Sequence, residues 1–185
     1  CPHPTAKFAA QAGENPHAAG ISMLGQAPGL AFRRPLEWVE DRRETWKYPE
    51  LWNADGTRKP QAAPVLYGQD VGGRGMFFAC NVGVAVTGGS AAVEGDRLIV
   101  RGADEAVLIV AAATSYNGFD KSPSREGRDA AGLCRQCLAA AGQRSWDDLL
   151  ARHVADYSAL FGRVEIDLGS PTDASLRTTN EIGRA

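Results

Sequence analysis

A polar and aromatic cluster at residues 114–121 follows directly after a long apolar run. The run, residues 106–113, is apolar almost throughout, which is typical of a strand buried on both faces of a sheet or sandwich. The hydroxyl and amide groups that come next need hydrogen-bond partners or water. Four residues, Tyr116, Asn117, Phe119 and Asp120, could rim a substrate pocket, or could belong to a hinge that ties the strand to the next domain. The hinge interpretation is favoured.

A second candidate is His153, which lies on the apolar side of a helical pattern, four residues before Tyr157. An imidazole there could orient a ligand hydroxyl or act as a general acid. A structural histidine, hydrogen-bonded to a neighbouring element, is the favoured interpretation.

Three tryptophans lie in a segment rich in Pro, Arg and Glu, at Trp38, Trp46 and Trp52. Aromatic rings could stack against a sugar, as a platform or a lid. Alternatively the rings pin the segment to the protein body, because burying each is worth about 2 kcal/mol. Pinning is favoured, and we expect residues 28–64 to form a long, decorated loop.

No catalytic residue is assigned from the carboxylates. Asp148 and Asp156 share one helix but lie about 12 Å apart along its axis, too far for a direct couple, and a chain with 22 Asp and Glu contains many chance pairs. Cys134 and Cys137 have the spacing of half a metal site. Because no second pair exists and the three histidines are scattered, we expect free thiols, no metal and no cofactor.

Composition limits the class of protein. The chain has 185 residues, 44% hydrophobic residues and a net charge of −2, which indicates one domain-sized soluble unit without an electrostatic footprint for nucleic acid or an anionic membrane. No apolar run reaches the ~20 residues of a membrane span. The opening residues lack a secretory pattern, so we expect an internal piece of a longer polypeptide, whose localisation stays unknown.

The elements that must position these residues are strands followed by helices. Period-2 patterns and turn signals predict strands at 6–11, 21–25, 76–86, 91–94, 97–101 and 105–113. The first two, separated by the turn-rich residues 13–16, are expected to form a hairpin or sandwich pair, and the last four a meander. Helical patterns follow at 129–141 and 146–161, the second N-capped by Ser145. Residues 164–168 are predicted as an edge strand and Pro171 as the start of a further helix. The expected fold class is α+β, an antiparallel β-sandwich followed by two helices.

Several motifs occur together in one order and resemble glycoside hydrolase family 95, the α-L-fucosidases. They are GQAP at 25–28, GMFF at 75–78, GAD at 102–104, AAATSYNGFDKSP at 111–123, RHVADYSALF at 152–161 and VEIDLG at 164–169. The resemblance implies a partial sandwich of the galactose-mutarotase-like super-sandwich type at 1–123 and a helical linker at 124–163. Residues 164–185 would be an edge strand and the truncated start of an (α/α)6 catalytic barrel.

The resemblance also implies a function. Family members hydrolyse terminal α-L-fucosyl linkages, typically α-1,2, by inversion, which requires an acid and a base about 6.5–9.5 Å apart. Those groups belong to the barrel, so none is carried over to this chain. We expect a non-catalytic support whose partners are the rest of the parent polypeptide and, through the barrel, a fucosylated oligosaccharide. The alternative is a noncatalytic carbohydrate-binding or interaction module.

Overall fold

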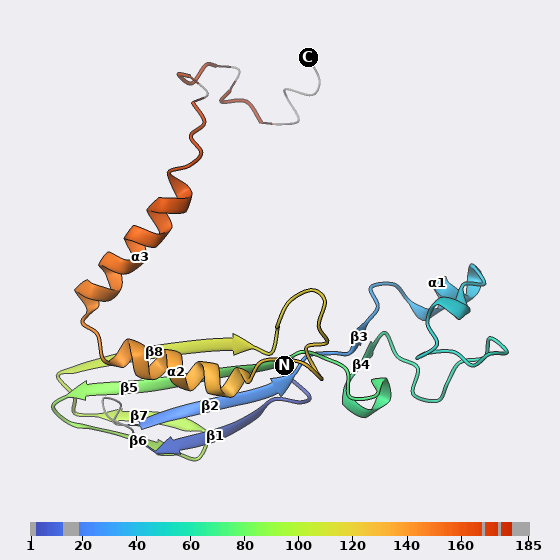
Figure 1. Cartoon of the computed structure of the whole chain (residues 1–185), viewed down its shortest axis with the longest axis horizontal. Helices are drawn as coiled ribbons and strands as arrows, with labels where there is room; N and C mark the ends of the chain where they lie inside the picture. The colour runs from blue at the N-terminus through green and yellow to red at the C-terminus, as the bar shows by residue number, and fades with distance from the viewer. Residues whose placement is uncertain (1–2, 13–18, 168, 174, 179–185) are drawn as a thin grey trace. The chain divides into compact units, whose positions relative to one another are not determined.

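The chain, a computed structural model described for residues 3–12, 19–167, 169–173 and 175–178, is built around a four-stranded antiparallel sheet (Figure 1). Its strands have the order β1-β2-β5-β8. They are β1 (Lys7–Ala12), β2 (Ala19–Gln26), β5 (Phe77–Thr87) and β8 (Glu105–Thr114). The predicted pairing of the first two strands is confirmed, with Phe8 opposite Met23. The turn predicted between them, at 13–16, lies outside the described residues.

The predicted meander is wrong in its connectivity, although all four of its strands exist. β6 (Ser90–Glu94) and β7 (Arg97–Arg101) form a separate two-stranded sheet, and β5 pairs directly with β8. The chain leaves β5 through Gly89, whose φ is +57° and where a Cβ would lie 2.2 Å from the Arg101 carbonyl oxygen. A short hairpin can therefore fold away while the two long apolar strands satisfy each other's backbone groups.

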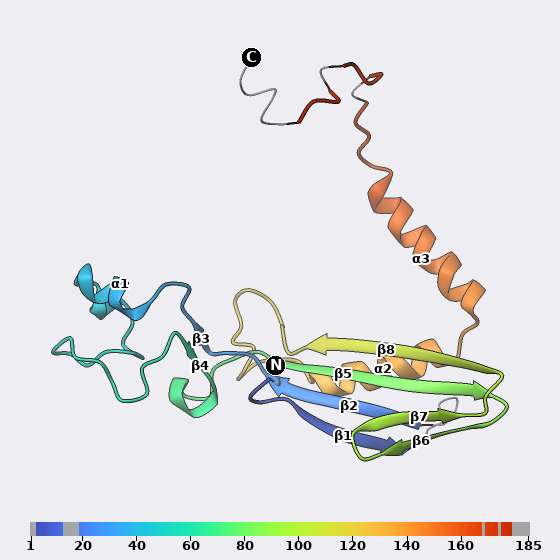
Figure 2. The same cartoon turned by 180° about the vertical axis from the view of Figure 1, so that it is seen from behind.

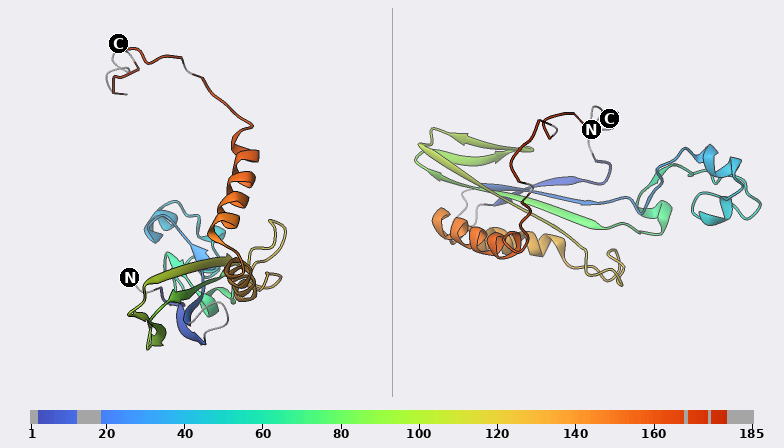
Figure 3. Two further views of the ribbon diagram at one scale, coloured as in Figure 1. Left: turned by 90° about the vertical axis from the view of Figure 1, so that its left-hand side faces the viewer. Right: turned by 90° about the horizontal axis from the view of Figure 1, so that it is seen from above.

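Helix α2 (Ala130–Gly142) packs on one face of the sheet, and the β6–β7 hairpin lies on the other (Figure 3). Asp129 caps the helix by accepting a hydrogen bond from the Gly132 N–H. Cys134 is fully buried and donates from its thiol to the Ala79 carbonyl at 3.4 Å. Burial, and secondly the nearby Cys80 thiol, raises the pKa of Cys134.

The opposite face of the sheet is only partly covered (Figure 2). The strand register places Phe8, Leu108 and Val110 on it, and all three are exposed. The prediction that β8 is buried on both faces is therefore wrong for this chain. Only its alternate residues, such as Ala111, lie under α2. Antiparallel sheets and two main helices give the expected α+β class, and no second large sheet packs against the first within the described residues.

Residues 28–75, which we call the Trp lobe, include the segment 28–64 that was predicted as a long, decorated loop. The segment folds around a core of its own. Its elements are β3 (Leu30–Ala31), α1 (Leu36–Asp41), the 3-10 helix η1 (Thr45–Lys47), β4 (Val65–Leu66) and the 3-10 helix η2 (Gly68–Val71). Sequence periodicity missed it because each element is too short to show a repeat.

The Trp lobe is closed at its neck by backbone and amide hydrogen bonds. The Ala27 N–H donates to the Met76 carbonyl at 2.8 Å, and the Gln26 amide donates to the carbonyls of Gly73 and Gly75. A Cβ at Gly75 would lie 2.2 Å from the Ala27 oxygen, and its φ is +130°. The close crossing of the two chain segments therefore requires glycine there.

Helix α3 (Trp146–Phe161) belongs to a second compact unit, residues 145–185, which is described by itself. Its predicted bounds are confirmed, as is its N-cap, because the Ser145 hydroxyl accepts from the Asp148 N–H at 3.2 Å. Residues 164–167 form no strand, so the predicted edge strand is wrong there, and Leu168 lies outside the described residues. Residues 171–173 and 175–177 form no helix, only turns at 173, 175 and 176 and a bend at 177, so the helix predicted from Pro171 is wrong for them. No helix in the described ranges is long and apolar enough to cross a membrane.

Candidate functional site

The three tryptophans of the Trp lobe lie in three different environments. Trp52 is 3% exposed, in the lobe core, and its indole N–H donates to Glu40 at 3.4 Å. Trp38 is half-buried, with the guanidinium groups of Arg34 and Arg42 over its ring at 4.9 and 4.2 Å. Both rings therefore hold the lobe together. Trp46 is 75% exposed.

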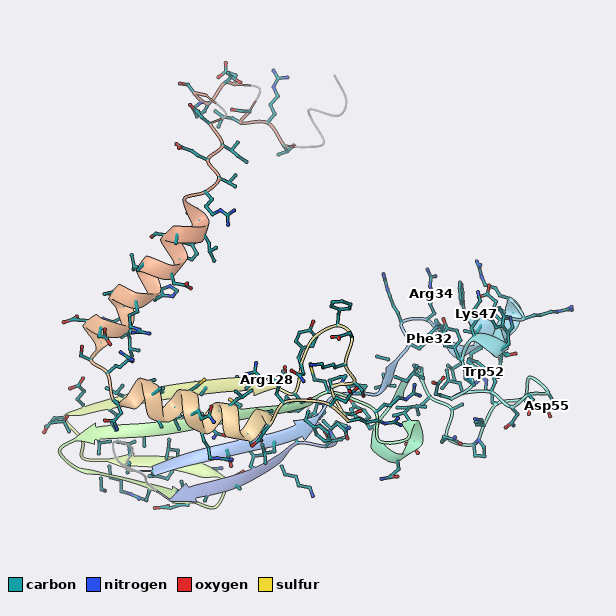
Figure 4. The ribbon with its side chains drawn as sticks, in the orientation of Figure 1. Phe32, Arg34, Lys47, Trp52, Asp55 and Arg128 are labelled. Carbon is teal, nitrogen blue, oxygen red and sulfur yellow. The ribbon has the colours of Figure 1, made fainter. Side chains whose placement is uncertain are left out.

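Trp46 lines a hollow of about 550 Å³. The other lining residues are Thr45, Pro49, Trp52, Asn53, Ala54 and Lys59. Figure 4 shows Trp52, Lys47 and Asp55 together on this lobe. The hollow combines an exposed ring with hydroxyl, amide and ammonium groups, the composition of a site for a small polar ligand.

A tight chain reversal at residues 51–59 forms part of the hollow's wall. The Asn53 N–H donates to the Thr57 carbonyl at 2.8 Å, and the Lys59 N–H donates to the Leu51 carbonyl at 2.9 Å. The Thr57 hydroxyl and N–H both donate to the Asp55 carboxylate, which lowers the pKa of Asp55. These bonds fix the backbone positions of Asn53 and Lys59 before any ligand arrives.

Arg58 binds this reversal to helix α1. Its guanidinium donates to both oxygens of Glu40 and, at 2.9 Å, to Glu37. These hydrogen bonds lower the pKa of Glu37 and of Glu40 and raise the pKa of Arg58. Sequence reasoning did not identify Arg58, Thr45, Asn53 or Lys59. The available signal was the interleaving of polar residues with Trp46 and Trp52.

The loop after β8, residues 115–129, is tied down by Ser115. Its buried hydroxyl accepts from the Phe77 N–H at 2.9 Å and donates to the Pro123 carbonyl at 2.6 Å. Its carbonyl accepts from the Arg128 N–H at 3.0 Å, which returns the chain to the start of α2. The signal for this anchor was the hydroxyl placed at the end of an apolar strand.

The predicted residues of this loop differ in their contacts and exposure. The Asn117 amide donates to the Glu126 carbonyl at 2.8 Å and so ties the loop to itself. Phe119 is 97% exposed, and Tyr116 and Asp120 are also exposed. Their assignment to a pocket rim or an interdomain contact stays a prediction.

His153 lies on α3, in the second unit, and is exposed. Its ring stacks on Tyr157 with 6.0 Å between centroids, and Tyr157 stacks on Phe161 at 5.1 Å. The three rings form an aromatic ladder along one side of the helix, with i, i+4 spacing. The assignment of His153 to a pocket rim or an interdomain contact stays a prediction.

The described residues of the first unit also line other hollows, including two with charged residues in their lining. One, of about 370 Å³, is lined by Glu50, Arg74 and Arg125 among others, and the Arg74–Glu50 ion pair (2.6 Å) lowers the pKa of Glu50. The other, of about 550 Å³, lies beside the start of α2 and includes Lys7 and Phe77. Among the described residues no group of three or more His, Cys, Asp or Glu converges as a metal site would require.

Two curated proteins are similar to this chain. "Alpha-L-fucosidase 2" of Arabidopsis thaliana is 35% identical over 107 residues, which is 56% of this chain and 13% of that protein. "Probable alpha-fucosidase A" of Aspergillus niger is 30% identical over 125 residues, 63% of this chain and 16% of that protein. The chain therefore spans a small part of the length of the relatives it matches. No protein-family profile matches the chain.

Proposed function

We propose that this chain is the supporting part of an α-L-fucosidase-like glycoside hydrolase of family 95. The parent enzyme would hydrolyse terminal α-L-fucosyl groups, α-1,2-linked by preference, with inversion. The sequence similarity to two proteins named as fucosidases carries the proposal. Because the chain matches only 13% and 16% of their lengths, the groups that perform the hydrolysis are assigned to the remainder of the parent polypeptide.

Several described carboxyl groups form structural pairs with arginine or threonine side chains. An inverting glycosidase needs a general acid whose pKa is raised, usually by burial away from cations. The carboxyl groups whose pKa is displaced here are displaced downward, chiefly by hydrogen bonds from arginine or threonine side chains. They are Glu37, Glu40, Glu50, Asp55 and Glu94.

The uncovered sheet face supports a role within a larger sandwich. Phe8 at one edge of the sheet, and the neighbouring Leu108 and Val110 at the other, lie on that face and are exposed; clustered apolar side chains such as the pair on β8 are typical of an interaction site. β8 is also an edge strand whose outer backbone groups are unpaired in the sheet order, and such an edge accepts a further strand. Other strands of a galactose-mutarotase-like sandwich would cover both. Residues 1–123 are the proposed sandwich part, 124–163 the linker and 164–185 the approach to the barrel.

Fragment complementation tests the proposal. The chain would be mixed with the Arabidopsis relative from which the matching segment has been deleted, and fucose release from an aryl α-L-fucoside would be measured. We expect no release by this chain alone and recovery of activity, or stable binding, in the mixture. Fucose release by the purified chain that is lost on mutating a residue of the chain would overturn the non-catalytic assignment. Failure of the mixture to associate or hydrolyse would overturn the supporting role.

The second candidate function, a noncatalytic carbohydrate-binding or interaction module, is favoured by one observation, the exposed ring of Trp46 in its hollow. Titration with fucosylated glycans, comparing the chain with Trp46→Ala, separates the two candidates when read beside the complementation assay. Saturable binding without complementation favours an independent module. Trp52→Ala is unsuitable for this test because that ring is in the lobe core.

A further inference from the structure

We infer that the hollow at Trp46 is a stacking subsite for the pyranose ring of a neutral sugar, outside the catalytic part of the parent enzyme. The inference rests on the proposed function only for the choice of a fucosylated glycan as the first probe. The geometry itself points to a ligand with one apolar face and several hydroxyl groups.

The exposure of Trp46 is the first observation. The lobe buries Leu51 and Trp52 completely or almost so, and packs Tyr48 against the same core, yet leaves the neighbouring Trp46 ring 75% exposed. A single exposed apolar side chain is ordinary on a protein surface. This ring, however, lines a hollow of about 550 Å³, within the size range of small-molecule sites.

The polar lining is the second observation. Thr45, Asn53 and Lys59 line the hollow with the ring and together offer hydroxyl, amide and ammonium groups, which donate to and accept from sugar hydroxyls. The Asn53 side-chain N–H donates to the Thr57 hydroxyl at 3.0 Å. Because the Asn53 side chain is exposed, its amide oxygen can accept from a ligand. The Lys59 ammonium donates to the Pro49 carbonyl and has three donors in all.

Pre-organisation is the third observation. Asn53 and Lys59 are fixed by the backbone bonds of the 51–59 reversal, and Arg58 binds that reversal to Glu37 and Glu40 of α1. Because these backbone positions are already fixed, a ligand that binds would have few groups to order, and the entropic cost of binding is lower. Lys47, 5.5 Å from the Trp46 ring centroid, is paired with Glu44 at 2.9 Å. This pairing offsets the charge of Lys47. The Lys59 ammonium donates to the Pro49 carbonyl and is near the Glu50 carboxylate, whose pKa it helps to lower. We therefore assign a neutral sugar in preference to an acidic one.

Binding by the whole chain tests the inference. The probes are methyl α-L-fucoside, 2′-fucosyllactose, lactose and methyl glucuronide, titrated by calorimetry and followed by tryptophan fluorescence. We expect saturable binding of a neutral probe, weakened about tenfold or more by Trp46→Ala, because the stacked ring is the main apolar contact. Trp46→Phe should restore most of the affinity. Trp146→Ala is the matched control, since Trp146 is 73% exposed on α3 and should leave binding unchanged.

Three results would overturn the inference. They are the absence of saturable binding to any neutral probe, equal affinity of the unaltered chain and the Trp46→Ala variant for that probe, and binding of the glucuronide alone. A fourth result would also overturn it. If Trp46→Ala abolished binding to the truncated Arabidopsis relative but left the affinity for sugars unchanged, the hollow would be part of a protein interface. The fucosidase proposal is judged by complementation with the unaltered chain, so the two can fail separately.

Discussion

The Trp lobe and helix α3 carry similar clusters of aromatic and aliphatic side chains, but only the lobe buries its cluster. In the lobe, Leu51 and Trp52 lie in a closed core and Arg58 fastens the 51–59 reversal to α1. On α3 the apolar stripe is exposed from one end to the other. Its members are Trp146, Leu150, Val154, Tyr157, Leu160 and Phe161.

The difference lies in whether each segment can bury its own apolar side chains. Short elements separated by turns can fold back on one another, so the lobe completes a core from its own 48 or so residues, a scale at which small folds become possible. One helix cannot cover its own stripe, and isolated helices of this length are marginal in water. The lobe therefore buries a core of its own, whereas the stripe of α3 is not covered within the described residues.

The largest expected effect comes from Trp52→Ala. Removing a buried ring should lower the free energy of unfolding of the lobe by about 3–5 kcal/mol, whereas Trp46→Ala should change it by less than about 0.5 kcal/mol. Denaturant unfolding followed by tryptophan fluorescence and by hydrogen exchange of residues 28–75 measures both. Equal effects of the two variants would mean that the lobe core is not its source of stability.

The next effect concerns the N-cap of α3. Ser145→Ala removes the acceptor for the Asp148 N–H and should destabilise the helix by about 1 kcal/mol. Because no packing in the second unit buries the helix stripe, this cost should appear as reduced helicity at residues 146–161 in NMR chemical shifts. Ser145→Asp should restore the cap. Ser158→Ala, at an exposed position within the helix, is the control and should not reduce helicity.

The sequence predicted the regular elements of the sheet and both long helices because each carries a local signal. Alternation and turn residues located the strands, and Asp129 and Ser145 marked the helix starts. Strand partners were less predictable, since pairing of β5 with β8 depends on where the hairpin at 88–102 folds, which is a tertiary property. The sequence overpredicted the burial of β8. Its apolar run suits a strand that is buried on both faces, but in this chain α2 covers only one face of it.

The candidate site was predicted only in part. Trp46 was named, but nothing in its spacing distinguishes it from Trp52, because exposure in the lobe depends on contacts between elements too short for a periodic pattern. Asn53 and Lys59 carried no signal of their own. Ser115 was visible as a hydroxyl at a strand end, yet two of its hydrogen bonds depend on the return of the chain at Pro123 and Arg128.

A third prediction concerns the ion pairs of Arg58 with Glu37 and Glu40 in the Trp lobe. In Arg58→Gln the pKa of Glu37 and of Glu40 should rise toward the ordinary value of 4.5. Because the native pKa values are lowered, the pairing contributes fully above about pH 4.5 and is lost as the pH falls through the native values. Carboxyl NMR titration measures the change. Glu94, paired with Arg101, is the internal control, and a shift there would indicate a general rather than local effect.

The smallest expected effect is that of Leu150→Ala on the isolated chain. Leu150 is 44% exposed on α3, so its truncation creates no cavity and should change the free energy of unfolding by less than about 0.5 kcal/mol. The same substitution should weaken association with the truncated Arabidopsis relative, because the stripe would then be buried. Asp147→Ala, on the first turn of the helix, is the control for association. A loss above about 1 kcal/mol in the isolated chain would mean that α3 is already packed, and the contrast with the Trp lobe would no longer hold.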